Sequence, residues 1–219
     1  MNFATISVAG KNLYACPSGA LYWPDHSLLV VSDLHLGKSE RIARRGGALL
    51  PPYDTAETLG RLQTEIERYR PNTVLCLGDS FDDIVAAQML DDDQRATLLR
   101  LQAGRIWLWV EGNHDPGPVE LGGTHLREFR LGPLVFRHIA DPYSTEGEVS
   151  GHYHPKARLR ASRRPCFLTD GKRVIMPAFG AYTGGLDWTT PVLRDLLSDN
   201  ATAFLTGRKV LAVPVPRAA

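Results

Sequence analysis

Five apolar runs in this 219-residue chain are each followed by a short motif whose side chains could bind a metal. Each motif supplies aspartate, asparagine or histidine where the apolar run ends, and open α/β sheets bind ligands beyond the carboxyl ends of their strands. The donors are carboxylates, imidazoles and one amide, without thiolate, which suits Mn²⁺, Fe or Zn²⁺ better than Cu⁺ or an iron–sulfur cluster. The motifs are Ser32-Asp33-Leu34-His35, Gly78-Asp79-Ser80-Phe81-Asp82, Glu111-Gly112-Asn113-His114-Asp115, Arg137-His138 and Gly151-His152-Tyr153-His154.

The number of donors indicates two ions rather than one. A catalytic ion keeps an open coordination position, so seven donors are too many for a single centre. Residues two apart in an extended segment point to the same side. Asp33 with His35, and His152 with His154, can therefore each chelate one centre, and two ions that share one carboxylate fit the count.

Strands and helices must bring these motifs together, and the apolar patterning predicts both. Turn-punctuated apolar segments predict a strand meander over residues 5–31. We expect a helix over 54–70 that begins with a capping box of Asp54 and Glu57, and a second helical region over 82–103, broken at 91–93. Strand–helix alternation followed by many strands predicts a layered α/β sandwich. The further strands are expected over 73–77, 106–110, 126–130, 134–138, 166–169, 174–176, 203–206 and 210–213.

Composition narrows the class of protein. At 43% hydrophobic residues the chain can bury a core, and no apolar run approaches the roughly 20 residues of a membrane-spanning helix. The first ten residues lack the features of a secretory signal. Cys16, Cys76 and Cys166 are scattered, without a disulfide or zinc pattern, which indicates a reducing compartment. We expect one domain over 1–219 and a cytoplasmic location.

The five motifs, in this order, resemble those of the calcineurin-like binuclear metallophosphoesterases: Asp-x-His, Gly-Asp-x-x-Asp, Gly-Asn-His-Asp/Glu, a lone His, and Gly-His-x-His. The match spans residues 33–154. Within that superfamily the chain is most similar to the bacterial ligase-associated DNA damage response endonucleases, through residues 32–38, 151–155 and 177–185. The resemblance implies a four-layer αββα sandwich, in which two mixed β-sheets are flanked by helices.

The same resemblance implies a role for each motif residue. His114 is implied to be catalytic, as general acid or as stabiliser of developing charge, and Asp82 to hydrogen-bond His114 and fix its orientation. His138 is a lone histidine without a second motif residue of a fixed spacing, and His125 is its competitor as a ligand. The implied ligands are Asp33, His35 and His154 for one ion and Asn113, His138 and His152 for the other, with Asp79 bridging both.

The mechanism expected for such a site is metal-assisted hydrolysis. Two divalent ions, Mn²⁺ before Fe or Zn²⁺, would generate hydroxide and clamp both oxygens of an in-line displacement at phosphorus. The sequence offers no Ser or Cys nucleophile elbow, which disfavours a Ser-His-Asp hydrolase. Protein phosphatases of this superfamily continue the second block as Asp-Arg-Gly, whereas here Asp82 is followed by Asp83, so a protein phosphatase is disfavoured.

Basic residues near the motifs suggest a polyanionic substrate. Of the 25 basic residues 20 are arginine, which binds phosphate in bidentate fashion. Residues 156–173 contain seven basic residues and one acidic residue, and four more basic residues lie within 38–45. They could equally be solvated loop charges. A formal net charge of +1 does not decide between these readings, because a sum hides its distribution. The expected substrate-binding residues are Lys38, Arg41, Arg158, Arg160, Arg163 and Arg164.

Together these features predict a manganese-dependent phosphodiesterase that acts as a DNA endonuclease, on single-stranded DNA in DNA repair. Functional links to a DNA ligase and a helicase are implied by the resemblance alone, and no membrane is expected as a partner. In the cytoplasm of a bacterium, the enzyme is expected to be associated with the nucleoid when it is on DNA. The alternatives are a small-molecule phosphodiesterase or nucleotide pyrophosphatase, or a metal-binding scaffold. Scaffold members of the superfamily have lost catalytic residues, whereas every motif residue is present here.

Overall fold

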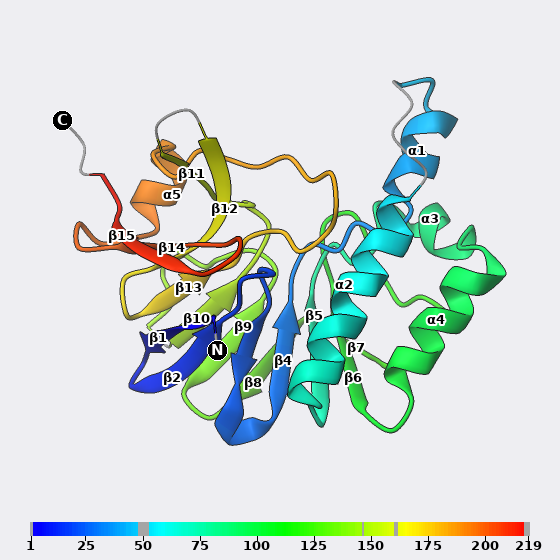
Figure 1. Cartoon of the computed structure of the whole chain (residues 1–219), viewed down its shortest axis with the longest axis horizontal. Helices are drawn as coiled ribbons and strands as arrows, with labels where there is room; N and C mark the ends of the chain where they lie inside the picture. The colour runs from blue at the N-terminus through cyan, green and yellow to red at the C-terminus, as the bar shows by residue number, and fades with distance from the viewer. Residues whose placement is uncertain (1, 48–52, 146, 160–161, 217–219) are drawn as a thin grey trace.

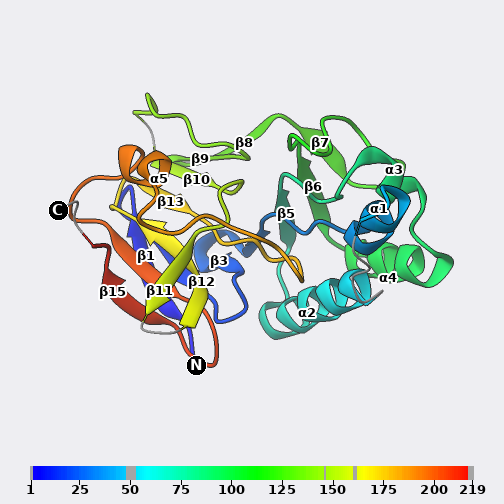
Figure 2. The same cartoon turned by 90° about the horizontal axis from the view of Figure 1, so that it is seen from above.

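Two β-sheets stacked face to face form the centre of the molecule, and helices cover their outer faces (Figures 1 and 2). The computed structural model describes residues 2–47, 53–145, 147–159 and 162–216. In the first sheet the strands lie in chain order; the first four pair antiparallel and the last four run parallel. They are β1 (Ala4–Val8), β2 (Lys11–Ala15), β3 (Leu21–Trp23), β4 (Leu28–Val31), β5 (Thr73–Leu77), β6 (Ile106–Val110) and β7 (Thr124–Leu126).

The second sheet has parallel strands in its middle and antiparallel strands at its edges. It is built from β8 (Glu128–Leu131), β9 (Leu134–Arg137), β10 (Gly147–Ser150), β11 (Lys156–Leu159), β12 (Ser162–Thr169), β13 (Arg173–Ile175), β14 (Thr202–Leu205) and β15 (Leu211–Pro214). Their order in space is β15-β14-β12-β13-β10-β9-β8, and β11 pairs with β12 outside this path. Strands β9, β10 and β13 are parallel to one another.

The helices lie on both sides of this pair of sheets. Four α-helices belong to the side of the first sheet: α1 (Lys38–Arg44), α2 (Asp54–Tyr69), α3 (Ile84–Gln88) and α4 (Asp92–Gln102). The short helix α5 (Pro191–Asp195) packs on the second sheet, and a 3-10 turn (Pro24–His26) joins β3 to β4. The predicted four-layer αββα sandwich of two mixed sheets is confirmed. Among the described residues, no helix is long and apolar enough to cross a membrane.

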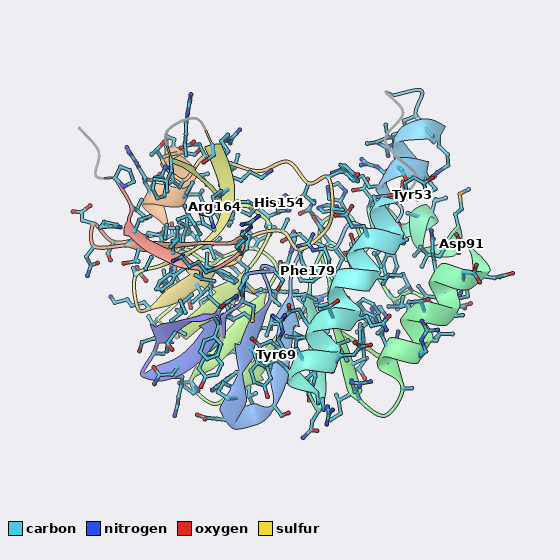
Figure 3. All side chains as sticks on the ribbon, viewed as in Figure 1. Tyr53, Tyr69, Asp91, His154, Arg164 and Phe179 are labelled. Carbon is cyan, nitrogen blue, oxygen red and sulfur yellow. The ribbon has the colours of Figure 1, made fainter. Side chains whose placement is uncertain are left out.

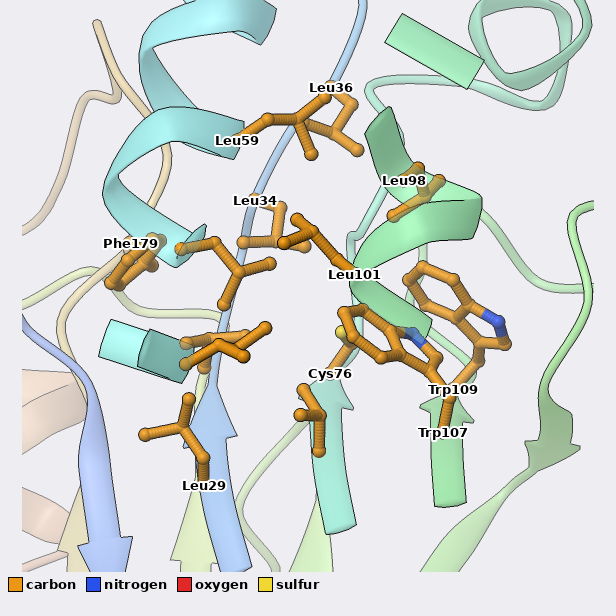
Figure 4. Close-up of a cluster of buried hydrophobic side chains, with 14 of the residues drawn as sticks. Leu29, Leu34, Leu36, Leu59, Cys76, Leu98, Leu101, Trp107, Trp109 and Phe179 are labelled. Atoms are coloured by element: carbon orange, nitrogen blue, oxygen red, sulfur yellow. The ribbon is translucent and has the colours of Figure 1, made fainter. Parts of the chain in front are cut away.

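Alternating side chains on the central strands build separate cores on the two faces of the first sheet. On β4, Leu28 and Val30 point into the core between the sheets, whereas Leu29 and Val31 point toward α2 and α4. The same alternation places Trp107 and Trp109 of β6 in the helix-side core (Figure 4). Because both faces are buried, the strands are continuously apolar, as parallel strands between two layers must be.

Most expected elements are present, and one predicted contact is wrong. The meander and the strands over 73–77 and 106–110 are confirmed. The second helical region is broken at 89–91 rather than at 91–93, since Asp91 caps α4 in a box with Gln94. The expected strand over 126–130 is two strands, β7 and β8, which belong to different sheets. Asp54 makes no capping box with Glu57. Its carboxylate instead accepts the backbone amides of Lys38 and Ser39, at 3.1 and 3.2 Å, at the start of α1. An aspartate therefore caps a neighbouring helix rather than its own.

Candidate metal centre

All five motifs follow parallel strands and meet at one edge of the two sheets. Residues 33–35 follow β4, 79–82 follow β5 and 113–115 follow β6, while His138 follows β9 and residues 152–154 follow β10. His154 lies on this upper edge in Figure 3, whereas Asp91 lies at the outer end of α4. Parallel strands end on the same side of a sheet, so the topology brings these donors together.

The first donor group consists of Asp33, His35 and His154, whose ligand atoms lie within 4.8 Å of one another. Asp33 is fully buried, and its Oδ1 lies 3.0 Å from Nε2 of His154. Its other oxygen accepts the hydroxyl of Ser32 at 2.5 Å. Burial alone would raise the pKa of Asp33, but the contacts with His154, His138 and Ser32 hold this pKa below its ordinary value.

The second donor group consists of Asp79, His138 and His152, and Asn113 joins it. Nδ1 of His138 donates to the main-chain oxygen of Leu77 at 3.1 Å. Nε2 of the same ring faces Oδ2 of Asp79 at 3.3 Å and Oδ1 of Asn113 at 3.0 Å. In a neutral imidazole this nitrogen carries a lone pair, which such oxygens would repel unless a cation or proton lies between them.

Within this group, Asp79 and His138 stabilise each other's charged forms. Burial alone would raise the pKa of Asp79, but His138 and His114 lower it to about 2. Burial alone would lower the pKa of His138, but Asp79 and Asp33 raise it. The competing residue His125 lies apart from the donor groups, with its ring stacked on Trp109.

His114 lies beside both groups. Its backbone amide donates to Oδ1 of Asp79 at 2.8 Å, and its Nε2 lies 4.0 Å from Oδ2 of the same carboxylate. The expected contact with residue 82 exists, but the main-chain oxygen makes it: Nδ1 of His114 donates to that atom at 2.9 Å. The Asp82 carboxylate instead lies 2.8 Å from Nδ1 of His35 and 2.7 Å from Nη1 of Arg41.

Asp115 is the last residue of the motif that contains Asn113 and His114, and the sequence alone assigns it no role. It is 6% exposed, and its two carboxylate oxygens accept the backbone amides of Ser80, Phe81 and Gly112 at 2.8, 3.2 and 3.0 Å. This carboxylate therefore ties the loop after β5 to the loop after β6. Burial raises its pKa to about 6, despite the three amide donors.

Two further observations indicate that the described residues are suited to bind metal ions. Nε2 of His35 is buried without a hydrogen-bond partner within the described part of the chain, and Nε2 of His154 makes no hydrogen bond there although it lies 3.0 Å from Oδ1 of Asp33. Buried polar atoms are rarely left so, and a bound cation would satisfy both nitrogens. The donor set of carboxylate, imidazole and amide is one that Mn²⁺, Fe and Zn²⁺ accept.

The backbone at the donors is left-handed, not extended as expected. Asp33, His35, Asp79, His152 and His154 have φ of 54°, 46°, 46°, 69° and 47°. Non-glycine residues rarely adopt this conformation, and it concentrates at functional sites. The side chains of each pair meet because of these turns, and not because of strand alternation.

The six expected substrate-binding residues have different surroundings. Arg158 and Arg163 are exposed and stand opposite each other in the β11–β12 pair. Lys38 is half-buried. Arg41 is bound to Asp82, and the Arg164 guanidinium donates to the main-chain oxygen of Thr206, so neither expectation of a substrate contact is supported. Arg160 lies outside the described residues.

The negative charge of Asp83 is also offset by neighbouring groups. It caps α3 by accepting the amide of Ala86 at 2.7 Å, and it lies 2.9 Å from the guanidinium of Arg44. The negative charge of Asp83 is therefore largely offset, so the presence of this carboxylate after Asp82 does not by itself disfavour a phosphomonoester substrate.

One known family matches most of the chain. Residues 26–201 match the sequence profile described as calcineurin-like phosphoesterase. The chain belongs to the calcineurin-like phosphoesterase family. As a member of this metal-dependent family it is a hydrolase of phosphoester bonds, and the two donor groups are the candidate sites for the two metal ions of the family.

One solved structure is similar to this chain over nearly its full length. Pseudomonas putida nuclease MPE is 28% identical, with a TM-score of 0.77, and the match covers 97% of this chain and 100% of that one. A conserved uncharacterized protein of Streptococcus pneumoniae TIGR4, a predicted phosphoesterase, is 15% identical over 85% and 96% of the two chains, with a TM-score of 0.34. No curated protein sequence matches this chain.

Proposed function

We propose that this calcineurin-like phosphoesterase is a manganese-dependent DNA endonuclease that acts on single-stranded DNA in DNA repair. The observation that carries the proposal is the likeness to Pseudomonas putida nuclease MPE, which extends over 97% of the chain. The five motifs that meet at one edge of the sheets supply the chemistry that such an enzyme needs.

The proposed ligands follow the two donor groups. Asp33, His35 and His154 would hold one ion, Asn113, His138 and His152 the other, and Asp79 would bridge both. The bound ions would supply an activated water and stabilise charge on the phosphate. His114 would act on the substrate itself: because its Nδ1–H donates to the oxygen of Asp82, Nε2 is the atom that would carry a proton to the leaving oxygen.

A cluster of positive charge beside the site supports a polyanionic substrate. Arg158 and Arg163 are register partners, and like charges directly opposite one another destabilise a strand pair unless an anion offsets them. Asp187 partly does so, since both arginines lower its pKa. Burial and the charges of Arg163 and Lys38 lower the pKa of Lys156, so Lys38 at the start of α1 adds to the same cluster. Successive phosphates of a nucleic acid would relieve this repulsion.

The test uses circular single-stranded DNA with Mn²⁺, and a small chromogenic phosphodiester as second substrate. Incision of the circle is expected. In the double variant Arg158→Ala with Arg163→Ala, kcat/KM for DNA should fall. Its dependence on the logarithm of salt concentration should become shallower by about 0.7 for each phosphate that the variant no longer neutralises. Turnover of the small diester should stay unchanged.

Arg100→Ala is the matched control, because the side chain of this exposed arginine of α4 hydrogen-bonds, within the described residues, only to Thr97 of its own helix. An intact circle together with fast turnover of a mononucleotide ester would show that the enzyme acts on small molecules instead. Repeating the assay with Fe²⁺ and Zn²⁺ tests the choice of manganese.

A further inference from the structure

A chain of three side chains connects helix α1 to the first donor group. Nη1 of Arg41 lies 2.7 Å from Oδ2 of Asp82, and Oδ1 of Asp82 lies 2.8 Å from Nδ1 of His35. Asp82 is 1% exposed and His35 6% exposed. Each carboxylate oxygen of the buried Asp82 thus has its own cationic or imidazole partner, while Arg41 reaches it from the partly exposed helix.

Arg41 is held at both ends of its guanidinium. Its Nη1 contacts Asp82, and its Nε lies 3.7 Å from Oδ2 of Asp83. Burial alone would raise the pKa of Asp82, but His35 and Arg41 lower it to about 2, so the carboxylate stays charged at neutral pH. A guanidinium engaged in this way is poorly placed to meet a substrate phosphate.

The start of helix α1 is hydrogen-bonded to the start of α2, which fixes the backbone that carries Arg41. The Asp54 carboxylate accepts both the Ser39 amide and, at 2.5 Å, the Ser39 hydroxyl. The amide of Gly37 donates to the hydroxyl of Thr55 at 2.8 Å. The first turn of α1, which leads directly into Arg41, is therefore tied to the first turn of α2.

We propose that Arg41 is a positioning residue, which holds the Asp82 carboxylate against Nδ1 of His35 so that Nε2 of this ring faces the donor group. The proposal rests on the proposed role of His35 as a ligand. A carboxylate at one ring nitrogen fixes the tautomer and the orientation of an imidazole whose other nitrogen binds a metal. Without Arg41, Oδ2 of Asp82 would be a buried charge with no cationic partner, and the carboxylate could turn away from His35.

Binding of Mn²⁺ to the metal-free protein tests this role, with unbound Mn²⁺ measured by electron paramagnetic resonance. In Arg41→Met one of the two ions should bind about 10-fold or more weakly, the size typical for loss of such a supporting group. The control is Arg44→Met, since Arg44 lies on the same helix and pairs with Asp83 but not with Asp82. This variant should bind both ions as the unchanged protein does.

Three outcomes separate the possible roles. Unchanged Mn²⁺ affinity in Arg41→Met, with KM for DNA raised, would overturn the proposal and make Arg41 a substrate contact. Unchanged affinity in His35→Ala would refute the ligand assignment instead, and the proposal with it. If circular dichroism shows that Arg41→Met does not fold, Arg41→Gln is measured in its place. Glutamine is polar but carries no charge, so affinity equal to that of the unchanged protein would overturn the proposal.

Discussion

His114 is placed by backbone contacts rather than by a side-chain partner. Its amide donates to Asp79, and its Nδ1 donates to the main-chain oxygen of Asp82. Its side chain is 32% exposed, so it can reach a substrate while Asp33, Asp79 and His138 stay buried. A backbone acceptor cannot change rotamer, so the tautomer of His114 is set by the fold of the loop after β5.

The variant His114→Ala should therefore lose turnover without losing metal. Positioned acid–base groups typically contribute about 10²–10⁴-fold, and kcat should fall by a factor in that range. Metal analysis of the purified variant should still find both ions. Asp79→Ala should lose ions as well as activity, since its carboxylate would serve both. Loss of metal from His114→Ala would make it a ligand.

At the scale of single residues, the sequence reveals most of the metal-donor residues but not the side chains that contact them. Asp33, His35, Asp79 and Asn113 lie in motifs whose spacing reveals them, whereas His138 is separated from His125 only by the fold. The two contacts of the Asp82 carboxylate come from residues 47 and 41 positions earlier, and no local pattern encodes them.

At the scale of elements, the segment between β13 and α5 supports the first donor group. It runs from the second sheet toward α2 (Figure 1). The amides of Phe179 and Gly180 donate to the main-chain oxygens of Ser32 and Asp33 at 2.8 and 3.1 Å, and Ala181 donates to the Thr58 hydroxyl. This segment thus fixes the loop after β4 from outside.

A methyl group at position 180 would disrupt this support. The Cβ of Gly180→Ala would lie 2.1 Å from the main-chain oxygen of Leu34, so the loop that carries Asp33 and His35 must shift. We expect the free energy of unfolding to fall by about 1–3 kcal/mol in urea denaturation, and Mn²⁺ affinity to fall as well. Gly184→Ala is the control in the same segment, because its Cβ would enter open space. Equal losses in both variants would refute the argument.

Strands and helices were predictable where buried side chains recur along the sequence with the period of a strand or a helix. The strands of the meander and the helix over 54–70 show such a recurrence of apolar residues. Helix α1, strand β11 and helix α5 were not expected, because their sequences are short and, in β11, dominated by charge. The cap of α1 comes from Asp54, which follows α1 by several residues in the sequence, so no local pattern at the start of α1 predicts it.

At the scale of the whole molecule, the cores hold all three cysteines. Cys16 and Cys76 lie in the core between the first sheet and its helices, and Cys166 lies in the core under α5. Burial raises the pKa of Cys16 and of Cys166 to about 12, and that of Cys76 well above its ordinary value. The layered fold therefore keeps these thiols protonated.

Stability should consequently fall at alkaline pH. An unfolded thiol releases its proton near pH 9, whereas the folded one keeps it, so each thiol lowers the free energy of unfolding by about 1.4 kcal/mol per pH unit above pH 9. Urea denaturation at pH 8.5 to 10.5 measures this slope, and Cys166→Ala should make it shallower. A thiol reagent at pH 8 should modify no cysteine in the native protein and three in urea; rapid native labelling would contradict the burial.

The left-handed backbone at five of the donors has a consequence for how this sequence tolerates change. Each such residue costs about 1–2 kcal/mol that glycine would save, yet glycine offers no donor atom. Glycine would relieve this strain, but it would also remove the carboxylate or imidazole, together with the hydrogen bonds that Asp33 and Asp79 accept. Backbone conformation and donor chemistry therefore favour different residue types at the same five positions.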